Sequence, residues 1–308
     1  MGDRKGVLHA VQARDATQLW TWHTPNGAAI TGAPAVDATA GLAFAGTATG
    51  TLYAVFTSGP SAGTLAWSSS LGGGNVQSPV LDGTDVYAAS TDGKVVKLAE
   101  STGTGAWSAT VPGVTIAPSL DPTPGGILAV PTTSGVTALS TATGTSLWSF
   151  AAPGATTPML AAHTMYVGSS NDNFYAVTES TGQQIWSQTT GGAIQDSGAL
   201  SLSSTGSVTG LFVGSADGRL YFLSHTTGAV LRHTGLGGSA HGLAVSGNMI
   251  FAAPTGVMEG VRTFGELVFA YGTRDAQLRP PAAVNGTCFV TGQNGTLWAF
   301  TPYGQTPQ

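Results

Sequence analysis

The sequence predicts an all-β protein, a β-propeller built from four-stranded antiparallel blades. Three observations support this prediction. A unit of about 40 residues recurs along the chain, each unit holds four short apolar runs separated by turn residues, and the composition is poor in helix formers. Of the 308 residues, 45 are glycine and only 8% are charged. No stretch keeps a 3.6-residue apolar period for more than about two turns, which argues against helices.

The stretch from Met159 to Gln188 shows the unit most clearly. Two apolar runs follow Pro158, a polar turn leads into residues 174–177, and Ser180-Thr181-Gly182 precedes a closing run that contains Trp186. Each run has the length of a half-buried strand, and each break carries Gly, Asn, Asp or Ser. Four antiparallel strands per unit are therefore expected.

Two markers fix the register of the repeat. One is a proline near the start of the leading strand, and the other is a glycine four residues before a tryptophan in the last strand. A buried tryptophan fills the gap between neighbouring sheets, and the glycine allows the tight turn before it. The markers are Pro34, Pro79, Pro118 and Pro158, then Gly63/Trp67, Gly103/Trp107, Gly144/Trp148 and Gly182/Trp186. Later units depart, with Arg232 and Pro280 assigned to the tryptophan position.

The units predict one domain over residues 1–308. Complete units begin near Ala33, Ser78, Ala117, Thr157, Ser197 and His241. Residues 6–24 match the last two strands of a unit and residues 281–302 the first strands, so together they are expected to form a closing blade that leaves no long edge. This favours seven blades. Eight stay open, because residues 7–10 and 297–300 both look like a third strand.

The repeat resembles that of the pyrroloquinoline-quinone (PQQ)-like β-propeller family. The pattern of an apolar strand, Gly-Ser-x-Asp-Gly, Leu-Tyr-Ala-Val, Thr-Gly and Trp is clearest in residues 167–186 and 213–221, and segment 251–272 departs most. The resemblance implies the fold rather than one activity, since the family includes quinone-dependent dehydrogenases, outer-membrane assembly lipoproteins and sensor domains. Its dehydrogenases hold the quinone with an adjacent cysteine pair, which this chain lacks. We therefore expect no bound quinone and no other cofactor.

Composition restricts the partners and the location. A net charge of −5 with ten scattered Lys and Arg argues against nucleic acid and anionic membranes. No apolar segment is long enough to span a membrane. Cys288, the only cysteine, lies in an apolar run and is expected to be a buried thiol. We expect an export signal upstream of this sequence and a bacterial protein that is secreted, periplasmic or exposed at the cell surface.

One face of the predicted propeller carries the candidate ligand-binding residues. The turns between second and third strands and the crossings into the next unit share this face, where a channel mouth is expected. Residues 254–266 look like a long insertion in the sixth turn, and such loops are often functional lids. The residues assigned to binding are Gln77, Thr157, Gln195, Ser197, Asp172, Glu259 and Arg262.

Asp196, His241 and Arg279 are the candidate catalytic residues, because they head consecutive units and should border adjacent sectors of the mouth. A carboxylate beside an imidazole supports acid/base chemistry near neutral pH. In the alternative interpretation, Asp196 caps a turn and His241 is a packing residue. The six histidines lack metal-ligand spacing, so no metal site is expected.

Two functions follow from these observations, and a structural scaffold is the third alternative. The first is an extracytoplasmic binding or interaction module that takes a small molecule, a glycan or a protein at the channel mouth. The second is a lyase, hydrolase or cyclase with its acid/base site under the 254–266 loop.

Overall fold

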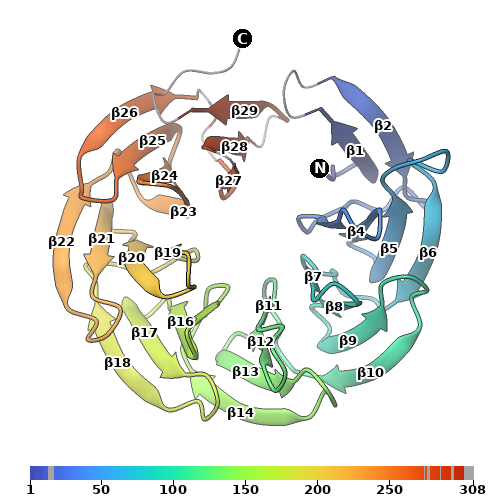
Figure 1. Ribbon diagram of the computed structural model, residues 1–308, viewed down its shortest axis with the longest axis horizontal. Helices are drawn as coiled ribbons and strands as arrows, with labels where there is room; N and C mark the ends of the chain where they lie inside the picture. Colours follow the sequence, from blue (N-terminus) through green and yellow to red (C-terminus); the bar gives the residue numbers. More distant parts are fainter. Residues whose placement is uncertain (13–16, 274, 276–277, 285, 293–294, 302–308) are drawn as a thin grey trace. The chain divides into compact units, whose positions relative to one another are not determined.

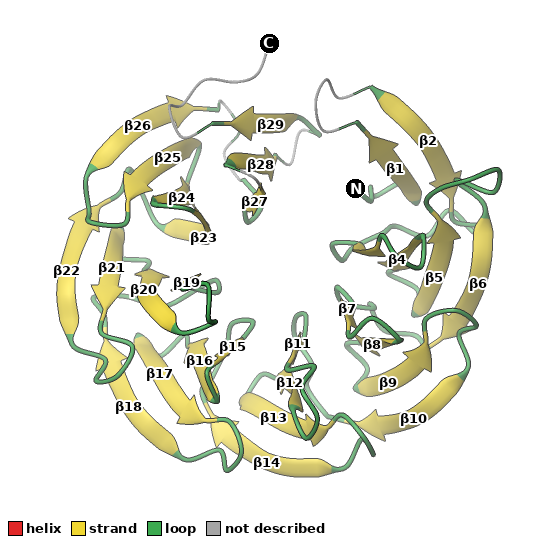
Figure 2. Ribbon diagram, viewed as in Figure 1, coloured by secondary structure: helices red, strands yellow, loops and turns green. Residues whose placement is uncertain are grey.

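The computed structural model describes residues 1–12, 17–273, 275, 278–284, 286–292 and 295–301. Within these residues there are strands and loops and no helix (Figure 2). The prediction of an all-β fold is confirmed. The described residues accordingly include no helix with the length and apolarity needed to cross a bilayer.

The chain divides into two compact units, and the first, Met1–Ala151, contains four antiparallel sheets (Figure 1). Their strands are β1 (Val7–Val11) and β2 (Gln18–His23); β3 (Ala35–Asp37), β4 (Leu42–Gly46), β5 (Thr51–Phe56) and β6 (Leu65–Ser70); β7 (Val80–Leu81), β8 (Asp85–Ala89), β9 (Lys94–Ala99) and β10 (Gly105–Thr110); β11 (Ser119–Leu120), β12 (Ile127–Pro131), β13 (Gly135–Ser140) and β14 (Ser146–Ala151).

The second unit, Ala152–Gln308, also contains four antiparallel sheets. Their strands are β15 (Met159–Ala161), β16 (Thr164–Gly168), β17 (Asn173–Thr178) and β18 (Gln184–Thr189); β19 (Ala199–Leu202), β20 (Val208–Gly214), β21 (Arg219–Leu223) and β22 (Val230–Gly235); β23 (Ala240–Ser246), β24 (Met249–Pro254), β25 (Val257–Arg262) and β26 (Leu267–Gly272); β27 (Ala282–Val284), β28 (Thr287–Thr291) and β29 (Leu297–Phe300).

Six of the described sheets are complete four-stranded meanders, as the repeat predicts. The chain begins with a two-stranded sheet and ends with a three-stranded one, which agrees with the predicted partial units. Their union into one closing blade, the choice between seven and eight blades, and a single domain over 1–308 stay predictions.

Burial explains why the runs differ within a unit. The second and third strands of a sheet lie between neighbouring sheets, so both of their faces are covered, and all five residues of β4 are buried. The fourth strand is the outer one and alternates between half-buried and exposed residues, as in β14. Near-continuous apolar runs therefore mark the middle strands. Cys288 is fully buried in β28, which confirms the predicted core thiol.

The tryptophans and glycines of the repeat interlock adjacent sheets. Trp67 of β6 packs on Gly103 of the next sheet, where an added Cβ would lie 2.6 Å from the ring. Gly103 has a φ of 69°, so the position favours glycine for two reasons. The Trp67 indole N–H also donates to the carbonyl of Glu100 at 2.7 Å. The same donation recurs from Trp20 to Thr57, from Trp107 to Thr141 and from Trp186 to His225.

The outer strands share a second feature, a β-bulge at one register. In seven sheets the pairing of the outer strand with its neighbour skips the residue before the tryptophan position. That residue is always aliphatic: Leu19, Ala66, Ala106, Leu147, Ile185, Leu231 or Val268. Since a bulge twists the edge of a sheet, it limits pairing with another strand.

Candidate functional site

One end of each complete sheet carries both its second-to-third strand turn and the crossings that lead into and out of it. We call this end the crossing face. Leu71, after β6, donates its backbone N–H to Gly50 in the turn of its own sheet at 2.7 Å. Two residues on, the N–H of Gly73 donates to the Asp92 carboxylate in the turn of the next sheet at 3.1 Å. Crossings and turns thus lie together, as the sequence predicts.

The three predicted catalytic residues begin successive sheets of the second unit. Asp196 is half-buried and accepts a hydrogen bond from the backbone N–H of Ser197 at 2.8 Å, a local contact of the kind expected from a turn-capping aspartate. Arg279 is exposed, and its backbone N–H donates to Thr291 at 2.8 Å. His241 lies in β23, and its side chain is outside the described residues. Their catalytic role stays a prediction.

The segments that carry these three residues adjoin one another. Ser239, just before β23, donates its hydroxyl to the side-chain oxygen of Gln195 at 3.1 Å, which ties the start of β23 to the segment before β19. Gly242 lies against the segment before β27, because a Cβ there would be 2.6 Å from Cα of Pro280. The segments that lead into β19, β23 and β27, with their polar residues, therefore lie side by side on the crossing face of this unit.

The other predicted ligand-binding residues fall in two places. Gln77, Thr157 and Ser197 are half-buried and precede first strands, and Asp172 lies in the turn between β16 and β17 with a φ of 68°. These positions are on the crossing face. Arg262 ends β25 at the opposite end of its sheet, so it cannot share a site there.

The predicted lid over 254–266 is wrong. Pro254 ends β24, Thr255 and Gly256 make a two-residue turn, and β25 follows at once. The sequence reasoning missed this strand because it sought a tryptophan. The β23–β26 sheet keeps the spacing of a glycine four residues before an aromatic residue, with Gly265 and Phe269. Phe269 pairs with Gly260 at the position where other sheets hold Trp. The aromatic position is therefore Phe269 and not Pro280.

Glu259 lies in β25 and is buried, with 4% of its surface exposed. One carboxyl oxygen accepts the backbone N–H of Gly237 from the preceding crossing at 2.9 Å, and the other has no described hydrogen-bond partner. Burial raises the pKa of Glu259, and the Gly237 N–H only partly offsets this. In the preceding sheet Tyr221 has this position and accepts from Gly191 at 3.2 Å. Glu259 thus replaces a tyrosine that ties a crossing to its sheet.

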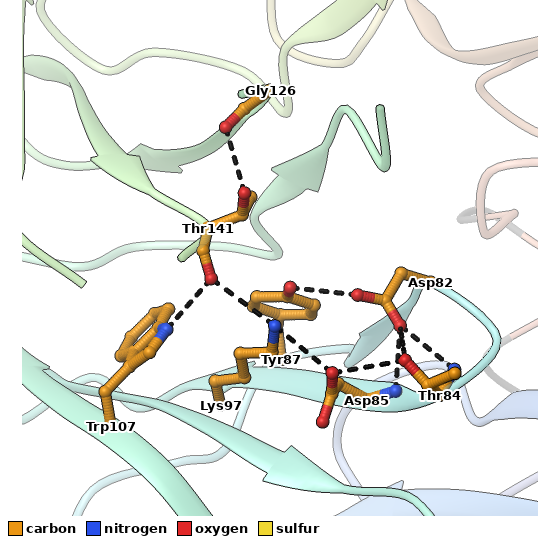
Figure 3. Close-up of polar contacts among 8 residues, drawn as sticks. All are labelled: Asp82, Thr84, Asp85, Tyr87, Lys97, Trp107, Gly126 and Thr141. Atoms are coloured by element: carbon orange, nitrogen blue, oxygen red, sulfur yellow. Dashed lines mark hydrogen bonds and ion pairs between the residues drawn. The ribbon is translucent and has the colours of Figure 1, made fainter. Parts of the chain in front are cut away.

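A polar network on the opposite face joins two sheets of the first unit (Figure 3). Lys97 of β9 pairs with Asp85 at 3.1 Å and donates to the carbonyl of Thr141 in the next sheet at 3.5 Å. Tyr87 donates to Asp82 at 3.0 Å. Burial alone would lower the pKa of Lys97, but its hydrogen bonds with Tyr87 and Asp85 outweigh it and raise that pKa. The polar groups of this network are paired with one another, which indicates a structural role for the network.

Glu100, after β9, is the second buried glutamate of the described residues with unpaired oxygens. The residue is 3% exposed. Burial raises the pKa of Glu100 to about 7, and the neighbouring carboxylates of Asp37 and Asp82 act in the same direction. Glu100 therefore retains a proton at a pH where an exposed glutamate is ionised. Among the residues that the structure describes, no group of three or more His, Cys, Asp or Glu could hold a metal ion.

Comparison with known proteins shows which family the chain resembles in sequence. The model of the family described as outer membrane protein assembly factor BamB matches residues 4–135 and 113–255. A search of the curated proteins gives no match.

Solved structures agree in fold at low identity. BamB from Moraxella catarrhalis is 18% identical, with a TM-score of 0.77 over 97% of this chain and 89% of that one. Sqt1 from Saccharomyces cerevisiae is 16% identical, with a TM-score of 0.77 over 97% and 91%. The computationally designed Ika8 protein is 17% identical, with a TM-score of 0.71 over 89% and 85%. These likenesses and the repeated sheets confirm the β-propeller fold class.

Proposed function

The chain belongs to the family of the outer membrane protein assembly factor BamB, and on this premise we propose that it is an extracytoplasmic propeller that binds another protein and holds no quinone. The observation that carries this proposal is the match to an assembly-factor model across residues 4–255. The single cysteine supports the absence of quinone, because the family's dehydrogenases use an adjacent pair.

We place the partner on the crossing face. In the second unit this face presents uncharged polar side chains, such as the exposed Gln195 and the half-buried Ser239 and Thr157, beside the charged Asp196 and Arg279. The uncharged groups suit hydrogen bonding to a backbone or to a glycan. A small molecule or a glycan at the same place is the alternative ligand.

The proposal is tested by binding of cell-envelope proteins to the immobilised chain. A Gln77→Arg/Gln195→Arg variant changes the crossing face in both units, and Gln184→Arg is the matched control on the outer strand β18. We expect at least one protein to be retained by the wild type and the control and lost by the variant. Retention of none, together with turnover of a substrate, would remove the proposal. Recovery of the protein in the cytoplasmic fraction of cells that express its natural gene would contradict the location.

A second candidate function is acid/base catalysis by Asp196, His241 and Arg279. The contacts of Ser239 with Gln195 and of Gly242 with Pro280 favour it, because they bring the three segments together. The structure leaves this candidate without the lid that the sequence predicted. His241→Ala should abolish any hydrolase, lyase or cyclase activity found, and His225→Ala is the control. Unchanged activity in His241→Ala would exclude this site.

A further inference from the structure

The β19–β22 sheet and the β23–β26 sheet depart from the repeat where they contact each other. Five outer strands carry tryptophan at the marker position, whereas β22 carries Arg232. The turn that faces this position in the next sheet holds a threonine before its glycine in four units, whereas the β25–β26 turn holds Phe264. The regular units have Thr102-Gly103, Thr143-Gly144, Thr181-Gly182 and Thr227-Gly228. Both departures concern the same contact between adjacent sheets.

The structure brings the two departures together. A Cβ added to Gly265 would lie 3.0 Å from Cδ of Arg232, so the turn after Phe264 packs on the arginine stem. The guanidinium carbon lies 6.0 Å from the ring centre of Phe222. Arg232 is exposed, and among the described residues no carboxylate pairs with it. Its charge is therefore available to a partner, in a chain whose net charge is −5.

Exposed apolar side chains flank the arginine. Leu231, the bulge residue of β22, is 68% exposed; Phe264 is 54% and Leu267 48% exposed. A threonine at position 264 and a tryptophan at position 232 would follow the repeat and would leave less apolar surface in water. The sequence departs from the packing rule here, and exposed apolar groups around one cation are typical of binding surfaces.

We propose that Leu231, Arg232, Phe264 and Leu267, which we call the Phe264 corner, dock a peptide segment of a partner protein that carries a carboxylate next to large apolar side chains. The carboxylate would pair with the Arg232 guanidinium in two hydrogen bonds, and the apolar side chains would cover Phe264 and Leu231. Because β22 carries a bulge beside Leu231, the segment binds through side chains rather than as an added strand. This inference rests on the proposed function and adds to it a second contact with the partner, away from the crossing face.

The test is selection from a displayed library of random 12-residue peptides on the immobilised full chain. The selected peptides should be enriched in Asp or Glu within three residues of Leu, Ile or Phe. Arg232→Glu should weaken their binding by about tenfold or more, and Phe264→Thr, which restores the repeat, by about fivefold. Glu266→Gln should strengthen binding by a few-fold, because it removes the exposed carboxylate of the same turn.

Matched controls separate this site from the rest of the surface. Ile185→Ser removes the bulge residue of β18, which is 50% exposed, and Arg219→Glu reverses an exposed arginine at the crossing face. Both should leave peptide binding unchanged. Thermal melting of every variant shows that it is folded, and Arg232→Trp should melt higher than the wild type while it loses the peptides.

Three outcomes would overturn the proposal. The library yields no binder, the selected peptides lack acidic residues, or they bind Arg232→Glu and Phe264→Thr as well as the wild type. In the last case the protein still binds peptides, so the proposed function survives while the corner does not. Sedimentation with anionic vesicles that depends on Phe264, without peptide binding, would assign the corner to a membrane surface instead.

Discussion

Glu100 predicts an unusual dependence of stability on pH. Its carboxyl is buried near the Asp37 carboxylate, and its pKa is raised from 4.5 to about 7. Replacing it with glutamine keeps the shape of the side chain and removes the titration. We therefore expect Glu100→Gln to unfold with nearly the same free energy as the wild type at pH 5 and to be more stable at pH 8.

The sign and size follow from proton linkage. The unfolded chain releases the Glu100 proton near pH 4.5, while the folded chain retains it to about pH 7. Between these values the folded state binds more protons, so the free energy of unfolding falls as the pH rises. One pKa unit corresponds to 1.36 kcal/mol, so the fall is about 3 kcal/mol. The fall in the free energy of unfolding is complete above the pKa of Glu100 in the folded chain.

Urea unfolding followed by tryptophan fluorescence measures this, because the Trp67 indole donates to the Glu100 carbonyl. Wild type and Glu100→Gln are compared at pH 5 and pH 8, with Glu266→Gln as the control for an exposed glutamate. The control should follow the wild type. If the difference between wild type and Glu100→Gln stays constant from pH 5 to pH 8, the raised pKa is wrong and so is the reasoning.

Three further predictions concern contacts between sheets, each checked by urea unfolding. Gly103→Ala should cost about 2–4 kcal/mol, whereas Gly59→Ala, with a similar positive φ and open space around it, should cost about 1 kcal/mol; equal losses would refute the packing argument. Arg232→Trp should raise the free energy of unfolding by about 1–3 kcal/mol, because it restores the tryptophan that packs between adjacent sheets. A lower free energy of unfolding would show that the β23–β26 sheet does not accept a tryptophan there. Lys97→Met should cost about 1–2 kcal/mol through the Asp85 pair, less at high salt, and an unchanged salt dependence would contradict this.

The fold was predictable because the residues that mark the interlocking contact between sheets recur at a short, fixed spacing within each unit. A glycine four residues before Trp67, Trp107, Trp148 or Trp186 is enough to place a turn, an outer strand and its neighbour. The sixth unit was misplaced because the same physical requirement is met there by different residues, Gly265 and Phe269. Phe269 takes the aromatic position of this outer strand, so a search restricted to tryptophan misses it.

The candidate site was less predictable, because roles depend on contacts across sheets. Glu259 was assigned to a loop ligand set, yet it accepts the Gly237 N–H from inside a strand. Arg232 was noted only as a departure from the pattern. Its relation to Phe264 depends on adjacent sheets packing together, and sequence spacing does not show which turn faces which strand.

The bulge beside each marker position has a consequence for how this protein can expose aliphatic residues without self-association. Leu19, Leu147, Ile185 and Leu231 are each at least half exposed on outer strands, and a straight strand bearing them would invite a neighbouring copy to extend the sheet. The skipped residue breaks the spacing of backbone donors and acceptors that such growth requires. The outer strands can therefore expose apolar side chains and still be poorly suited to pairing with a strand of a second copy.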